Sequence, residues 1–141
     1  MATADEIRAD IAAGAEAFRA AADGFSGDWE AGDDDNWSAR KVAEHTLGSV
    51  GFFAGTVANA MDARAAEKTA AELASSADVG PALDAGLEVL NRVFRYVEDR
   101  DMVKPVDRPD SMDWDATIGA CMVRAGTHFT EHAESINERS S

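Results

Sequence analysis

The chain has little of several residue types, and each shortage narrows what it can be. With a single cysteine, Cys121, it can form neither an intramolecular disulfide nor a cysteine-based zinc site. Lys and Arg number 13 against 27 Asp and Glu, so the net charge is −14. A surface that binds the phosphates of DNA, RNA or an anionic membrane needs clustered basic side chains. We therefore expect neither nucleic acid nor membrane as a partner.

Long apolar runs are missing too. No stretch approaches the roughly 18 apolar residues that a membrane span needs. Residues 2–6 are acidic and are not followed by the apolar stretch of a secretory signal. We expect a cytoplasmic protein. Hydrophobic residues make up 45% of the 141 positions, which supplies one core but not two, so residues 1–141 are expected to form a single domain.

Apolar side chains recur at helical spacing in four segments, and no segment alternates as a strand does. Helices of about 20 residues span roughly 30 Å each, and four with connected apolar seams make a bundle. The sequence therefore predicts an all-α four-helix bundle. The expected helices cover about residues 5–22, 39–61, 79–100 and 114–137.

Local capping signals support these boundaries. Thr3 begins a capping-box spacing, in which a hydroxyl and a carboxylate three residues later satisfy the opening amides. Ser38 and Asp78 are N-cap residue types just before the second and third segments. Thr69 begins another capping-box spacing, which predicts a short connector helix over residues 70–74.

The third segment has an unusually broad apolar face. One neighbour in a bundle does not cover so much of a helix's circumference, so we expect a homodimer that uses this helix or the second one. The residues of this face are Leu83, Leu87, Leu90, Val93, Phe94 and Val97.

All three histidines fall on the predicted core seams. His128 and His132 are four apart, so their Cβ atoms lie about 6 Å apart on one helix face. Two imidazoles so placed can converge on one ion at roughly 2.1 Å each. His45, on the predicted inward face of the second helix, supplies a third ligand if the second and fourth helices meet. Three protein nitrogens leave positions open for water or substrate, as in reactive metal sites.

A single histidine on an apolar face is usually a core residue that meets a hydroxyl or carbonyl. Three of them without a purpose are unfavourable, because unpaired buried imidazoles cost desolvation energy. Residues 128–132 also spell His-x-x-E-His, the inverted zinc-protease pattern. That class needs a further ligand well downstream, and nine residues follow His132, so we do not expect a peptidase. Glu131 is then a surface charge, or a base near the ion.

Several other residues have two readings each. Cys121 lies on the same seam about 10 Å from His128, and is either a thiol near the site or a small buried hydrophobic residue. Trp29 and Trp37 either line the mouth of the site or plug the end of the bundle. Three arginines of the third segment either bind a carboxylated thiol cofactor or form a solvated face: Arg92, Arg95 and Arg100.

Two motifs resemble those of the DinB/YfiT family, metalloenzymes that include the mycothiol-dependent maleylpyruvate isomerase. Residues 37–45 (WSARKVAEH) are similar to the Trp-led start of its second helix, which ends in a histidine ligand. Residues 127–132 (THFTEH) are similar to its fourth-helix His-x-x-x-His. The resemblance implies an up-down-down-up four-helix bundle in which His45, His128 and His132 hold a zinc or nickel ion. Nothing in the chain resembles the isomerase's extra C-terminal domain.

The resemblance also implies transferase or isomerase chemistry that uses a low-molecular-weight thiol such as mycothiol or bacillithiol. We therefore expect a metal-activated thiol to attack a small electrophilic substrate. Two alternatives stay open at this stage: a hydrolase in which the same ion activates water, and a non-catalytic dimeric bundle that binds metal or a small molecule. No catalytic residue beyond the three ligands is assigned.

Overall fold

The computed structural model describes residues 2–140, which fold into four long α-helices. These are α1 (Ala4–Asp23), α2 (Ala39–Ala60), α3 (Val79–Phe94) and α4 (Ile118–Glu138). Two short 3-10 helices, η1 (Ser76–Asp78) and η2 (Asp99–Asp101), flank α3. Over the described residues there is no strand beyond an isolated bridge between Pro105 and Thr117. The predicted all-α four-helix bundle is confirmed.

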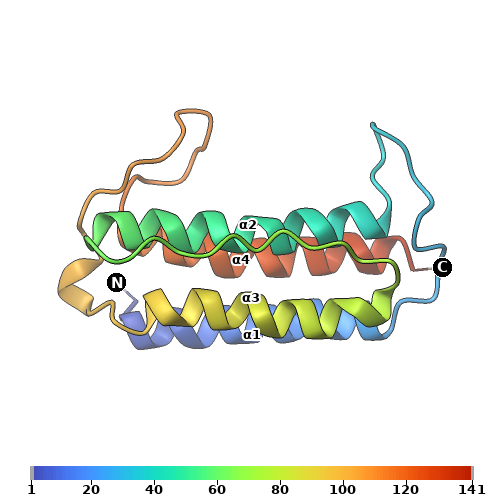
Figure 1. Cartoon of the computed structure of the whole chain (residues 1–141), viewed down its shortest axis with the longest axis horizontal. Helices are drawn as coiled ribbons and strands as arrows, with labels where there is room; N and C mark the ends of the chain where they lie inside the picture. The colour runs from blue at the N-terminus through green and yellow to red at the C-terminus, as the bar shows by residue number, and fades with distance from the viewer. Residues whose placement is uncertain (1, 141) are drawn as a thin grey trace.

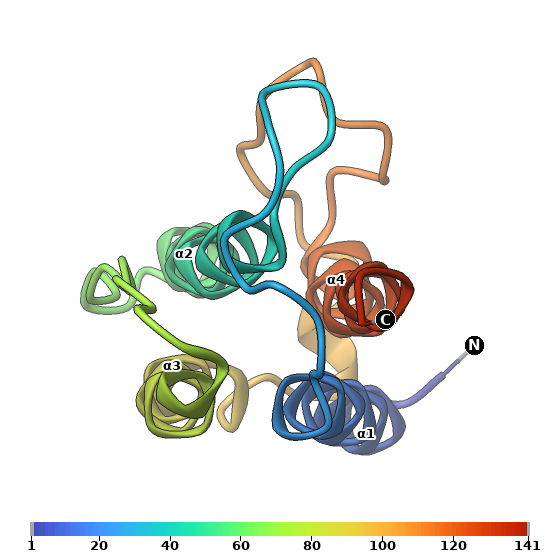
Figure 2. The ribbon, with the colours of Figure 1, turned by 90° about the vertical axis from the view of Figure 1, so that its right-hand side faces the viewer.

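The helices lie at the corners of a square when the bundle is seen end-on (Figure 2). Two of them, α2 and α3, run in one direction, and α1 and α4 run in the other (Figure 1). The order is therefore up-down-down-up. Helix α4 lies beside both α1 and α2, while α3 is diagonally opposite it. Among residues 2–140 no helix is both long and apolar enough to cross a bilayer.

Helix α1 approaches α4 closely near the histidine-bearing part of α4. Gly14 faces α4 so closely that a Cβ atom there would lie 2.7 Å from the carbonyl oxygen of Gly126. Phe18 packs on Phe129 with ring centroids 5.9 Å apart, and both rings are buried. This packing fixes the turn of α4 that carries His128.

Side-chain caps begin three of the four helices. Thr3 Oγ1 accepts from the Glu6 amide at 3.1 Å, and Ser38 Oγ accepts from the Lys41 amide at 3.1 Å, as the sequence predicts. Helix α4 starts at Ile118 rather than near Trp114, because residues before it are drawn into backbone pairing with the preceding loop: the Ile118 amide donates to the Lys104 carbonyl at 3.0 Å. Thr117 caps this later start.

Helix α3 is shorter than predicted. It ends at Phe94, well before Arg100. The guanidinium of Arg8, from α1, donates to the carbonyls of Phe94 and Val97, each at 2.9 Å, and so satisfies acceptors that a further helical turn would have used. Asp78 is the N-cap residue of α3 as predicted, but its carboxylate accepts from the Ser75 amide and makes no capping hydrogen bond to α3.

The predicted connector helix over residues 70–74 does not form. Those residues belong to an extended connector that runs along α2 and α3 (Figure 1). The reason is the use made of Thr69: its hydroxyl donates to the Leu47 carbonyl at 2.6 Å and accepts from the Gly51 amide at 2.8 Å. A hydroxyl engaged with α2 is not free to cap a new helix.

Candidate metal centre

The antiparallel contact between α2 and α4 brings the three histidines together. His45 comes from the first half of α2, His128 lies at the middle of α4, and His132 lies one turn further along α4. Their three candidate ligand atoms all lie within 4.8 Å of one another. The ring of His45 is centred 5.1 Å from each of the other two rings. The predicted meeting of the second and fourth helices is thus observed, and these residues could hold a metal ion.

The α4 pair has the geometry of two ligands on one ion. The Nε2 atoms of His128 and His132 lie 3.1 Å apart. With bonds of roughly 2.1 Å to a shared ion, that separation corresponds to an angle of about 95° between the two bonds. An angle in this range lies between those of octahedral and tetrahedral coordination. The pair therefore fits a divalent ion without a change of helix geometry.

The three rings differ in burial, which corrects one expectation. His128 is buried and His132 is half-buried, but His45 is exposed and does not lie on a core seam. Helix α2 packs against both α3 and α4, so its buried face is rotated away from His45. That face consists of Val42, Ala43, Thr46, Leu47, Val50, Phe53, Ala54 and Val57. The cluster therefore lies at the rim of the α2–α4 contact, with its His45 side toward solvent.

The electrostatics of the cluster favour neutral rings. Burial, with the neighbouring His132 and His45 in second place, lowers the pKa of His128 to about 3. Burial also lowers the pKa of His132 and the pKa of His45. Neutral imidazoles present the lone pairs that a metal ion requires.

One buried atom in the cluster also lacks a partner. Nδ1 of His132 has no hydrogen-bond partner among the described residues. A buried ring nitrogen without a partner costs free energy, and such atoms in native proteins usually have a ligand, ion or water as partner. Nε2 is the atom of His132 that faces His128, so an ion shared by the pair would not reach Nδ1, and the fit to a metal ion rests on the converging nitrogens alone.

Aromatic side chains flank the cluster on both sides. Trp37 meets His45 edge-on at 5.3 Å between ring centroids, and Phe53 meets His128 at 5.6 Å. Trp114, from the loop before α4, packs on Phe53 at 6.5 Å. Sequence reasoning missed Trp114 as a neighbour of the site, because it placed this residue in the first turn of the fourth helix, whereas it lies in the loop before α4.

The two tryptophans weighed from the sequence have different positions. Trp29 is buried, and its indole N–H donates to the Leu73 carbonyl at 2.8 Å, so it plugs the bundle beneath the connector. Trp37 is partly exposed and contacts a candidate ligand, so it lines the site. Lys41 lies over the Trp37 ring at 4.7 Å and places a positive charge nearby.

Cys121 does not belong to the site. Its side chain is fully buried, its Sγ lies 3.8 Å from the Phe53 carbonyl oxygen, and burial raises the pKa of the thiol to about 12. A thiol with that pKa is protonated at neutral pH and is not a nucleophile. The hydrophobic reading of Cys121 is therefore the one the structure supports.

The remaining charged candidates are surface groups. Glu131 pairs with Arg124 at 2.7 Å on the exposed side of α4. Arg92 and Arg100 pair with exposed glutamates, and Arg95 stacks on Tyr96. Arg92 and Arg95 lie on α3 and at its end, diagonally across the bundle from α4 (Figure 2), and Arg100 lies in η2, near Met102, which contacts the start of α4 at Gly119. They are therefore not placed to hold a cofactor at the histidine cluster.

Comparisons with models of protein families, with curated proteins and with solved structures found no match for this chain.

Proposed function

We propose that this chain is a metal-dependent enzyme, a transferase or isomerase that uses a metal-activated low-molecular-weight thiol on a small electrophilic substrate. The observation that carries the proposal is the convergence of three histidines whose lowered pKa values keep them neutral, at a rim where His45 is exposed. A structural site is normally closed by four protein ligands, whereas three protein ligands leave a position for a reactant.

Zinc and nickel are the ions we propose, because imidazole ligands suit both. The bound ion supplies Lewis acidity and lowers the pKa of a coordinated thiol or water. His128, buried between α2 and α4, fixes the position of the donor set. His45, exposed at the rim, completes it on the side from which a substrate arrives.

The surroundings of the cluster favour an anionic reactant. Burial is the main cause of the lowered pKa of each histidine; Arg124 adds to it at all three rings, while its ion-pair partner Glu131 acts in the opposite direction on the pKa of His128 and His132. The chain has a net charge of −14 and so repels an approaching thiolate or carboxylate; the positive charge of Arg124 offsets part of this repulsion near the histidines. Trp37 and Phe53 provide apolar contact and keep water away from the rings that they cover.

The thiol in this proposal comes from outside the chain. Cys121 is the single cysteine, and its buried, protonated side chain does not serve. The resemblance of residues 37–45 and 127–132 to the two DinB/YfiT motifs supports a small thiol cofactor in that role. Glu131 is held by Arg124 on the exposed side of α4, so we assign it no role in the reaction.

The test is a turnover screen of the zinc-loaded and nickel-loaded chain. Mycothiol, bacillithiol or a simple thiol is combined with small electrophiles such as an unsaturated diacid; thioether formation is followed by mass spectrometry, and isomerisation by proton NMR. We expect turnover that needs both metal and thiol, that disappears in His128→Ala and that persists in Cys121→Ala. Turnover without thiol would identify a hydrolase. Full metal binding without any turnover would contradict an enzymatic role.

A further inference from the structure

A cavity lies away from the histidines, between the connector and α3. It has a volume of about 490 Å³, within the ~300–1,000 Å³ of sites for small molecules. Its walls come from residues 61–67, just after α2, and from the last two turns of α3 with Tyr96 beyond them. None of the three histidines lines it, so it is separate from the candidate metal centre.

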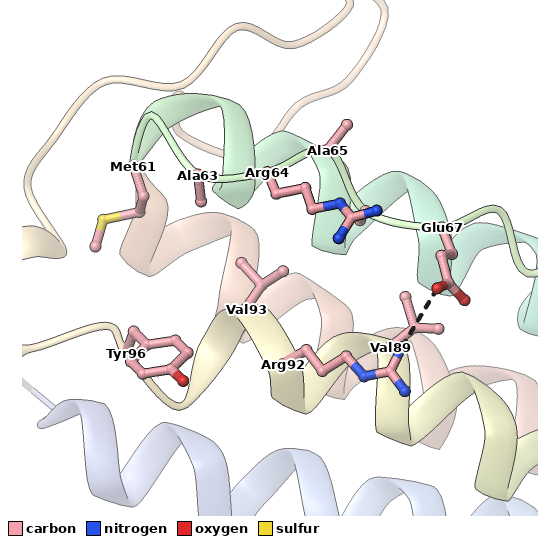
Figure 3. A pocket seen from close by; sticks show the side chains of 10 residues that line it. Met61, Ala63, Arg64, Ala65, Glu67, Val89, Arg92, Val93 and Tyr96 are labelled. Carbon is pink, nitrogen blue, oxygen red and sulfur yellow. Dashed lines mark hydrogen bonds and ion pairs between the residues drawn. The ribbon is translucent and has the colours of Figure 1, made fainter.

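The floor of this cavity is apolar. Figure 3 shows Val89 and Val93 pointing from α3 toward the connector, with Met61 and Tyr96 together at one end. Tyr96 is 67% exposed, which is high for an aromatic ring in a bundle whose other large rings are mostly covered. An exposed ring beside an apolar floor offers contact area to a hydrophobic group.

The other end of the cavity carries positive charge. In Figure 3 the guanidinium group of Arg64 lies beside the connector and that of Arg92 beside α3, both away from the end with Met61 and Tyr96. Arg92 already bonds to Glu88 at 2.9 Å and, more loosely, to Glu67 at 3.4 Å. Over residues 2–140, Arg64 has no carboxylate within ion-pair distance, although the chain is rich in acids.

The connector that forms the roof has few internal bonds. Its backbone leaves the helical ladder after the Ala63 amide bonds to Ala58, and its next anchor is the Thr69 hydroxyl on α2. Between these anchors the peptide groups of residues 64–68 make no backbone hydrogen bonds with other described residues. They are available to a ligand, and the roof can adjust to its width.

We propose that this cavity binds a small amphipathic carboxylate. Its head group would lie between Arg64 and Arg92, and its apolar part would follow Val93 and Met61 toward Tyr96. The distribution of charge supports this ligand, because the two arginines lie at one end of the cavity and the apolar surface extends to the other end. The net charge of −14 repels anions from the rest of the surface, so an anion is expected to bind only where arginines gather. The head group would replace Glu67 on Arg92.

The experiment uses octanoate as the probe and the full chain as purified. Amide chemical shifts are followed by NMR during titration, with acetate and octyltrimethylammonium as matched probes that lack the tail or carry the opposite charge. We expect saturable shifts at residues 61–67 and 89–96 with octanoate and not with the other two. Residue-level shifts also separate this cavity from carboxylate binding at the histidines.

Charge variants test the head-group site. Arg64→Gln and Arg92→Gln should each weaken octanoate binding by about two- to fivefold, the range for partly exposed ion pairs. Arg100→Gln, which removes the same charge from an exposed position outside the cavity, should leave affinity unchanged. Glu67→Gln should strengthen binding, because it removes the competing carboxylate from Arg92.

Three results would overturn the proposal. The first is an equal affinity of Arg64→Gln and Arg100→Gln for octanoate, which would show that Arg64 does not bind the carboxylate. The second is an equal effect of octyltrimethylammonium at the same amides, which would show that charge does not matter. The third is the lack of saturable shifts in residues 61–67 and 89–96 while the circular dichroism of the chain is native.

Discussion

The Nε2 atoms of His128 and His132 face each other at 3.1 Å across one turn of α4. Two lone pairs at that distance repel unless a proton or a cation lies between them. Burial lowers the pKa of both rings, so both are neutral, and a proton can lie between them only as the N–H of one ring that donates to the other. A divalent ion bound by this pair and by His45 would instead accept a lone pair from each of the three rings. This relationship underlies the first two predictions.

The first prediction concerns metal content. Chain purified without chelator should carry close to one zinc or nickel per molecule by elemental analysis. His128→Ala and His132→Ala should each lower metal affinity by more than about 100-fold, because even changes to residues that only support ligands cost 10–100-fold. Asn137→Ala, an exposed change on the same helix, should retain the metal. Equal metal content in all four proteins would place the ion elsewhere.

The second prediction is the pH dependence of metal-free stability. His128 has a pKa of about 3 in the folded chain, whereas an unfolded histidine titrates near 6.5. As the pH falls below about 6.5, the unfolded chain binds a proton that the folded chain does not, so this residue makes the free energy of unfolding fall with pH down to about 3. Above 6.5 the contribution is constant.

Comparison with a variant separates the contribution of His128 to the pH dependence of stability from the contribution of the many carboxylates. Chemical denaturation of wild type and His128→Ala between pH 7.5 and 4.5 should show a steeper loss of stability in wild type. The two curves should be parallel above about pH 7. Parallel curves over the whole range would mean that His128 is not buried as the structure has it.

Much of the fold and the site could be predicted from the sequence, for physical reasons that particular residues illustrate. The seam of α1 is read correctly because α1 packs mainly on α4, where Ile11 lies against Gly126 and Phe18 against Phe129. The exposure of His45 was not predictable, since α2 packs against two helices and its apolar period alone does not fix which edge is covered. The His-x-x-x-His pair was predictable because its geometry is local to one turn.

Long-range contacts account for the rest. The end of α3 depends on Arg8, which comes from α1, and the loss of the connector helix depends on a hydroxyl that bonds α2. Neither partner is near in sequence, so local capping patterns point the wrong way. The homodimer through α2 or α3 stays a prediction, as does the cytoplasmic location, and light scattering at micromolar concentration tests the first.

The third prediction is that Cys121 is unreactive in the native chain. Its thiol is fully buried and protonated at neutral pH, so a thiol-reactive dye should modify it no faster than the chain unfolds. In denaturant the same thiol should react within the mixing time. Rapid native labelling would show that the α2–α4 contact opens, and would restore Cys121 as a candidate nucleophile.

The fourth prediction separates a catalytic ion from a structural one. Bundle stability comes from apolar side chains on four helices, so removal of the ion with chelator should leave the helical circular dichroism at 25 °C unchanged. The melting temperature should still drop modestly, because any ligand of the native state stabilises it by mass action. Loss of the helical signal on chelation would assign the ion a structural role instead.

The last prediction concerns the helix contact that supports the histidine pair. Gly14→Ala places a methyl group 2.7 Å from the Gly126 carbonyl oxygen, a backbone atom one turn or less from His128. The α1–α4 pair must then separate, at a cost of about 1–3 kcal/mol that outweighs the gain of up to about 1 kcal/mol from alanine in a helix. Gly55→Ala in α2 has no neighbour within 4 Å and should instead stabilise the chain by about 0.5–1 kcal/mol. Thermal unfolding of the two variants should therefore shift in opposite directions, and Gly14→Ala alone should weaken metal binding, since the displaced helix carries two of the three ligands. A stabilised Gly14→Ala protein would show that α1 does not hold α4 in place.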